Sequence, residues 1–149
     1  MTALETPRLK LLPYTPGDLD HLAALYADGD VTANTKLGQL NREQAKQTLD
    51  EYLATWRTSG FGMYAALDRA TGEYVGEAGL FERDGGDDPA LRYIVHKRFW
   101  GQGLAYEAAH AVIGYAFQNL SLNRLDAFVE GTNEASHRIA QKLGFAEQE

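Results

Sequence analysis

Arg98-Phe99-Trp100-Gly101-Gln102-Gly103 stands between a strand-like run at 90–95 and a long helical pattern at 104–119. The first N–H groups of a helix have no internal acceptor, and the helix dipole adds partial positive charge there. Glycines let the backbone approach an anion because no Cβ intervenes. The stretch therefore predicts a phosphate-binding loop. Its spacing matches neither the G-x-G-x-x-G dinucleotide fingerprint nor the G-K-S/T of a P-loop, so those two sites are disfavoured.

The rest of the chain alternates strand-like and helical segments. Thr15 and Asn41 begin two helical patterns as N-caps, and Gly60 ends the second. The pattern at 104–119 is apolar nearly all round, Phe117 included, so this helix is expected to be buried. Strands are expected at 7–12, 62–67, 74–81, 90–95 and 124–129, a loop at 28–40, and a last helix after Thr132 or Asn133.

This order predicts an α/β (α+β) fold in which a mixed central sheet carries helices on both faces. The chain has no internal repeat, linker or low-complexity segment, so residues 1–149 are expected to form one domain. Right-handed crossover connections place the strands before the last two helices side by side. The N-termini of these two helices are then expected to face one cleft.

Composition excludes several classes of protein. With no cysteine among 149 residues, the chain has neither a disulfide framework nor a thiolate metal site, which fits a reducing compartment. The sequence contains no membrane-length apolar run and no signal peptide, so the cytoplasm is the expected location. A net charge of −7 argues against nucleic-acid binding and suits cationic acceptors. The four histidines lack ligand spacing, so no metal site is expected.

A second motif lies at the start of the last helix. It reads Asn133-Glu134-Ala135-Ser136 and the helix ends at Lys142-Leu143-Gly144-Phe145. Taken locally, Asn133 is a helix cap and Ser136 a filler residue. Arg98 offers a guanidinium to the predicted phosphate, although a solvated arginine is the commoner case. Arg8, with Lys10, is interpreted as part of a solvated strand face.

Together these motifs resemble the GCN5-related N-acetyltransferases (GNAT). The resemblance rests on Arg98-x-x-Gly101-x-Gly103, on Glu107-Ala108 in the following helix, and on the second motif. The match is closest to the branch that contains the ribosomal-protein alanine N-acetyltransferases, whose typical opening is found here as Glu5-Thr6-Pro7-Arg8-Leu9-x-Leu11. The family fold implies a mostly antiparallel sheet. Family members also continue past Phe145 into a closing hairpin, for which this sequence is too short.

The resemblance implies acetyl-CoA as co-substrate and assigns roles to several residues. The end of the strand, at Val95 and His96, would pair with the pantetheine amides. Asn133 would contact the pantetheine arm and Ser136 would lie near the sulfur. Backbone amides of the loop would hold the pyrophosphate, from Gly101, Gln102, Gly103, Leu104 and Ala105.

Two departures leave the acid and the base open. Many family members carry a Tyr seven residues after the Asn, where this chain has Ala140. The branch often has a Glu near the start of the fourth strand, where this chain reads Pro89-Ala90-Leu91-Arg92. The remaining candidates are Ser136 as proton donor to the leaving thiolate, and Glu77, Glu82 or His96 as base through water.

Two functions are therefore compared. The first is an N-acetyltransferase that moves an acetyl group from acetyl-CoA to a primary amine: a protein N-terminal α-amine, an amino acid or a small amine. The alternative is a non-catalytic acyl-CoA-binding module that has lost its acid and base. Without a closing hairpin, the open edge of the strand at 124–129 is expected to be covered by a second copy in a homodimer, or by an irregular segment of this chain.

Overall fold

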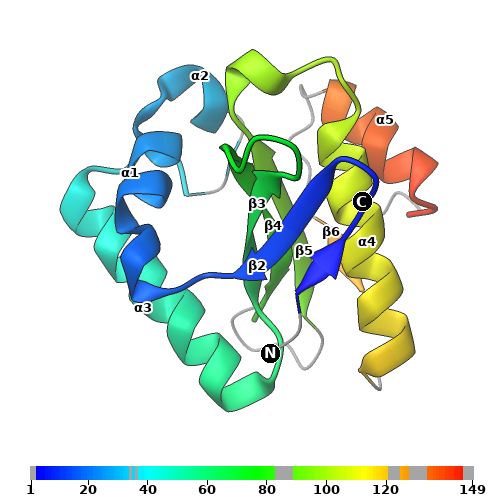
Figure 1. Cartoon of the computed structure of the whole chain (residues 1–149), viewed down its shortest axis with the longest axis horizontal. Coiled ribbons are helices and arrows are strands. Elements are labelled where there is room, and N and C mark those ends of the chain that lie inside the picture. Colours follow the sequence, from blue (N-terminus) through cyan, green and yellow to red (C-terminus); the bar gives the residue numbers. More distant parts are fainter. Residues whose placement is uncertain are drawn as a thin grey trace.

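The computed structural model describes residues 3–33, 35, 37–82, 89–120, 125–127 and 134–145. Its centre is one twisted sheet whose strands follow chain order from β1 to β6 (Figure 1). The first five strands are antiparallel to their neighbours, and β6 runs parallel to β5, which confirms the mixed, mostly antiparallel sheet. The strands are β1 Leu4–Glu5, β2 Leu9–Pro13, β3 Met63–Asp68, β4 Tyr74–Phe81, β5 Ala90–Val95 and β6 Asp126–Ala127.

Helices cover both faces of the sheet (Figure 1). The α1–α3 group packs on one face, and α4 packs on the other. Lys142 of α5 lies over the ring of Tyr106 in α4, with 4.3 Å between Nζ and the ring centroid. The helices are η1 Pro16–Asp18, α1 Leu19–Ala27, α2 Gly29–Thr32, α3 Arg42–Ser59, η2 Lys97–Phe99, α4 Leu104–Asn119 and α5 Glu134–Lys142.

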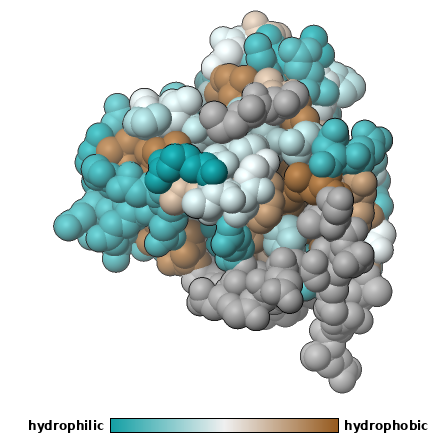
Figure 2. All heavy atoms as spheres, turned by 90° about the horizontal axis from the view of Figure 1, so that it is seen from below, coloured by the Kyte–Doolittle hydropathy of each residue, from teal (hydrophilic) through white to brown (hydrophobic). Residues whose placement is uncertain are grey.

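Side-chain alternation along the strands divides the core into two layers. On β4, Val75 and Ala78 face α4, whereas Tyr74 and Glu77 face α1 and α3. Gly76 lies between these two pairs, where the register of β4 against β3 shifts. A Cβ at Gly76 would lie 2.1 Å from the carbonyl oxygen of Ile94. On the face seen from below, hydrophobic side chains show in several separate patches among hydrophilic ones (Figure 2).

Local signals explain the helix boundaries. The Asn41 side chain accepts from the N–H of Gln44 at 2.8 Å, and the Gln44 side chain accepts from the N–H of Asn41 at 2.9 Å. Gly60 ends α3 with φ +72°, a left-handed conformation that glycine adopts without strain. The predicted helix 104–119 is confirmed as α4, and the predicted strands 74–81 and 90–95 are β4 and β5.

The structure departs from the sequence predictions in several places. The segment 28–40, predicted as a loop, contains the short helix α2, which Asp28 caps by accepting from the N–H of Asp30 at 2.9 Å. The two-residue strand β1 was too short to be seen by alternation. Phe117 is 52% exposed, because it lies on the outer side of α4. Of the predicted strand 124–129, the structure shows β6 at 126–127; Leu125 is buried but not in a strand, and residues 124, 128 and 129 lie outside the described part of the chain.

Candidate active site

The predicted phosphate-binding loop has the backbone that an anion site requires. It leaves β5, passes through η2, and enters α4 at Gly103. Gly101 and Gly103 both have φ +79°, which side chains with a Cβ rarely adopt. The first helical hydrogen bond of α4 runs from the N–H of Glu107 to the Gly103 carbonyl, at 3.0 Å. The amides of residues 104–106 therefore precede the first helical bond and point out of the helix end.

Arg8 holds this loop from the other end of the chain. Its Nη1 donates to the carbonyl of Gln102 at 2.7 Å, and its Nε lies 2.7 Å from Oε1 of Glu107 in α4. The backbone N–H of Arg8 and the hydroxyl of Thr6 both donate to the other oxygen of that carboxylate. Arg8 is exposed, as the sequence predicted, but its side chain is also tied to Glu107 and Gln102, which the sequence did not indicate. Its partners are about a hundred residues away in the sequence, beyond the reach of a local pattern.

Trp100 braces the same loop against β5. Its indole N–H donates to the carbonyl of Val95 at 2.9 Å, while half of the residue, 50%, stays exposed. At the end of the strand that was expected to pair with pantetheine, the Val95 carbonyl thus already accepts one hydrogen bond. Within the described residues, β6 pairs with β5 only at Ala90 and Leu91, near the start of β5. The end of β5 that carries Val95 lies beyond that pairing.

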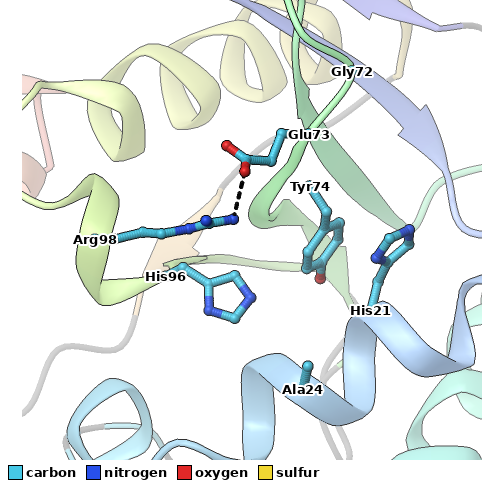
Figure 3. Close-up of a pocket in the computed structure, with 7 residues that line it drawn as sticks. All are labelled: His21, Ala24, Gly72, Glu73, Tyr74, His96 and Arg98. Carbon is cyan, nitrogen blue, oxygen red and sulfur yellow. Dashed lines mark ion pairs between the residues drawn. The ribbon is translucent and has the colours of Figure 1, made fainter.

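Arg98 lies between the loop and a pocket. Its Nη2 is 2.9 Å from Oε2 of Glu73, and its guanidinium lies over the ring of Phe99 at 4.8 Å. Both partners of the ion pair are exposed, so it contributes little to stability. The open pocket beside it has a volume of about 460 Å³ and is lined by His21, Ala24, Gly72, Glu73, Tyr74, His96 and Arg98 (Figure 3).

His96 brings a proton acceptor to this pocket. Burial lowers the pKa of His96, and the neighbouring charge of Arg98 lowers it further. A lowered pKa keeps the imidazole neutral near pH 7, and a neutral imidazole accepts a proton. The structure thus brings two predicted site residues, His96 and Arg98, into the same pocket, and Arg98 precedes Gly101 by three residues.

Glu77 lies in the interior and not at the pocket surface. Only 1% of the residue is exposed, and three tyrosines donate to its carboxylate. Tyr14 donates to Oε1 at 2.9 Å, whereas Tyr26 and Tyr52 donate to Oε2 at 2.7 and 3.0 Å. Burial raises the pKa of Glu77, and these donors and the charge of Arg92 oppose the rise. No alternation or motif in the sequence indicated this cage.

The remaining predicted site residues lie elsewhere. Glu82 follows the far end of β4 from the pocket and accepts a hydrogen bond from Ser59. Ser136 belongs to the first turn of α5, and its side chain lies outside the described part of the structure. Asn133 also lies outside the described residues. Ala140, at the position where many family members carry Tyr, is half-buried.

Among the described residues, no group of three or more His, Cys, Asp or Glu side chains is placed to hold a metal ion. None of the described helices combines the length and the apolar character needed to cross a bilayer.

Comparison with known proteins identifies the fold and the class of enzyme. The family model of the acetyltransferase (GNAT) domain matches residues 8–146. The chain belongs to the GNAT acetyltransferase family. The N-acetyltransferase YoaA of Bacillus subtilis, itself uncharacterised, is 29% identical over 147 residues, which are 97% of this chain and 83% of YoaA.

Solved GNAT structures superpose closely on this chain. An acetyltransferase from Agrobacterium tumefaciens is 26% identical with a TM-score of 0.87, and the match covers 97% of this chain and 83% of that one. RimL, a ribosomal L7/L12 α-N-protein acetyltransferase in complex with coenzyme A, shares the fold at 14% identity with a TM-score of 0.84, over 99% of this chain and 86% of its own. The predicted family and its likeness to ribosomal-protein acetyltransferases are confirmed, and this GNAT protein is an acyltransferase.

Proposed function

We propose that this GNAT enzyme transfers an acetyl group from acetyl-CoA to a primary amine. The observation that carries the proposal is the pair of positive φ angles, +79° at both Gly101 and Gly103, at the N-terminus of α4. They turn successive amides outward at the positive end of a sixteen-residue helix. A pyrophosphate is the anion that such a row of amides binds well.

The donor site follows from the loop and its supports. Amides from Gly101 to Ala105 hold the pyrophosphate, and the end of β5 at Val95 pairs with the pantetheine arm. RimL, which shares this fold, was solved with coenzyme A, and this supports the same class of donor here. Asn133 and Ser136 keep the roles that the family resemblance implies, near the pantetheine and the sulfur.

The acceptor is an amine that must lose a proton before it attacks. Attack on a thioester needs a neutral nitrogen placed near the carbonyl, and much of the acceleration comes from that placement. The His96 pocket offers an imidazole with a lowered pKa, a few residues before the glycine loop in the chain. We assign this pocket to the acceptor: a protein N-terminal α-amine, an amino acid or a small amine.

Calorimetry with coenzyme A tests the donor site. Gly103→Val adds a β-branched side chain at φ +79°, where even a Cβ lies 3.4 Å from Nη2 of Arg8. We expect its affinity for coenzyme A to fall by at least about tenfold, because the loop must shift away from the anion. Gly60→Val is the control, since Gly60 has a similar φ of +72° at the end of α3, away from the loop. Equal losses in both variants would refute the donor site.

Thiol release from acetyl-CoA over a panel of amines tests the reaction. Turnover on any primary amine, with the amide identified by mass spectrometry, supports the enzyme. Tight binding of coenzyme A without turnover on any amine favours the acyl-CoA-binding module instead.

A further inference from the structure

The buried carboxylate of Glu77 is joined to the pocket by a chain of two hydroxyls. Tyr14 and Tyr74 lie with their hydroxyl oxygens 2.6 Å apart, and Tyr14 lies 2.9 Å from Oε1 of Glu77. All three residues are buried, with exposed fractions of 2% for Tyr14, 6% for Tyr74 and 1% for Glu77. Hydrogen bonds in such an interior are stronger than at the surface, and the buried hydroxyls have few other partners within reach.

The direction of these hydrogen bonds follows from the chemistry of the groups. An ionised carboxylate only accepts, so the Tyr14 hydroxyl donates its single proton to Glu77. The oxygen of Tyr14 must then accept from Tyr74 across the 2.6 Å contact. The proton of Tyr74 therefore points inward, and lone pairs of its oxygen remain available for a donor on the other side.

That other side is the pocket. The Tyr74 ring stacks on His21 with 4.7 Å between centroids, and His96 meets it edge-on at 5.8 Å. The Tyr74 hydroxyl points toward α1 between these two imidazoles (Figure 3). The aromatic faces of this pocket suit an ammonium group, and the Glu73 carboxylate, which is paired with Arg98 at 2.9 Å, offsets the charge of that arginine. We take the bound group to be the ammonium form of the acceptor amine, whose N–H protons can be donated to the Tyr74 oxygen.

We propose that Tyr74 and Tyr14 form a relay that carries a proton from the acceptor ammonium in this pocket to Glu77. The inference rests on the proposed acetyl transfer. An N–H bond of the ammonium breaks as Tyr74 gains a proton; Tyr74 passes its own proton to Tyr14, and Tyr14 passes its own to Oε1. The amine becomes neutral and Glu77 becomes a carboxylic acid. After the product leaves, the reverse shift returns the proton to solvent.

Charge around the relay favours a basic Glu77. Burial is the main cause that raises the pKa of this carboxyl, which makes the carboxylate a better proton acceptor than an exposed one. The relay requires an ionised carboxylate, a form that the charge of Arg92 and the three tyrosine donors favour by opposing the rise in the pKa of Glu77. The titratable and charged groups around the chain of hydroxyls are Asp18 of η1, His21 and Tyr26 of α1, Tyr52 of α3, Arg92 of β5 and His96, with the Glu73–Arg98 pair at the pocket end.

Tyr14→Phe and Tyr26→Phe form a matched pair that tests the relay. Each variant removes one buried donor to Glu77, but only Tyr14 also contacts Tyr74. With an amine that the wild type acetylates, we expect kcat/KM near pH 6.5 to fall about tenfold or more in Tyr14→Phe and much less in Tyr26→Phe. Thermal unfolding and calorimetry with coenzyme A accompany both variants, so that a loss of folding or donor binding is recognised.

The pH dependence separates a proton relay from a structural cage. The loss in Tyr14→Phe should disappear above the pKa of the acceptor, where the amine is already neutral, and should be small for amines of low pKa. Equal losses in the two variants, or a loss that is independent of pH and of the amine, overturn the relay and leave acetyl transfer standing. A wild type that acetylates no amine overturns both proposals.

Discussion

Arg8 and Glu107 join the residue just before β2 to the first turn of α4. Nε of Arg8 lies 2.7 Å from Oε1 of Glu107, and the same guanidinium reaches the carbonyl of Gln102 at 2.7 Å. One side chain thus fixes both the helix and the loop that precedes it. Such support favours anion binding, because a loop that is already ordered loses less conformational entropy when the anion binds.

Arg8→Ala should weaken coenzyme A binding by about fivefold, which corresponds to about 1 kcal/mol for charge-assisted hydrogen bonds made by a half-exposed side chain. The loss arises because the Gln102 carbonyl is released and the loop samples other conformations. Calorimetry measures the change. Lys10→Ala is the control, because Lys10 is an exposed cation two residues further along the chain. An equal loss of affinity in this variant would show that the net charge of the protein, and not the contact with Gln102, affects binding.

Glu107→Gln should lower stability at neutral pH and have little effect in acid. Burial alone raises the pKa of Glu107, but the hydrogen bonds from Thr6 and Arg8 and the Arg8 charge outweigh it and lower the pKa below 4.5. A lowered folded pKa contributes stability that is present above the unfolded pKa and lost as pH falls through the folded one. Urea unfolding at several pH values should show the gap between variant and wild type closing below about pH 4.5. A gap that is constant down to acid pH contradicts this assignment.

Trp100 should report donor binding by its fluorescence. The protein has two tryptophans, and Trp56 is buried in the core while Trp100 is 50% exposed beside the glycine loop. Titration with coenzyme A is expected to change the emission of the wild type and leave that of Trp100→Phe nearly unchanged. Trp100→Phe also removes the hydrogen bond to Val95, so its affinity should fall several-fold. Phe117→Leu, at a similarly exposed apolar residue on the far part of α4, should bind like the wild type.

Ser136→Ala should lower kcat more than it raises KM for acetyl-CoA. A hydroxyl near the leaving sulfur acts mainly in the transition state, so its loss affects the chemical step rather than binding. Steady-state kinetics with a good acceptor measures both constants. An unchanged kcat would mean that Ser136 only fills the first turn of α5 and that water protonates the thiolate.

Much of the fold was determined by signals between close neighbours in the sequence. Helix caps such as Asn41 with Gln44 involve residues three apart, and the alternation of apolar and polar residues at 7–12 has a period of two. The glycine loop was found in the same way, because strand, glycines and helix follow one another directly. Shorter elements such as α2 and β1 escaped, since four and two residues are too few to show a period.

The supports of the site were decided only by tertiary structure. Arg8 reaches a carbonyl 94 positions later, and Glu77 receives hydrogen bonds from tyrosines 25, 51 and 63 positions away. Such partners are selected by how α1, α3 and the sheet pack, and no local spacing encodes that choice. The sequence by itself places a glutamate within a strand of mostly apolar residues. Any such carboxylate must find hydrogen-bond donors if it is buried. Packing determined that those partners are tyrosines, one of which leads through Tyr74 to the pocket.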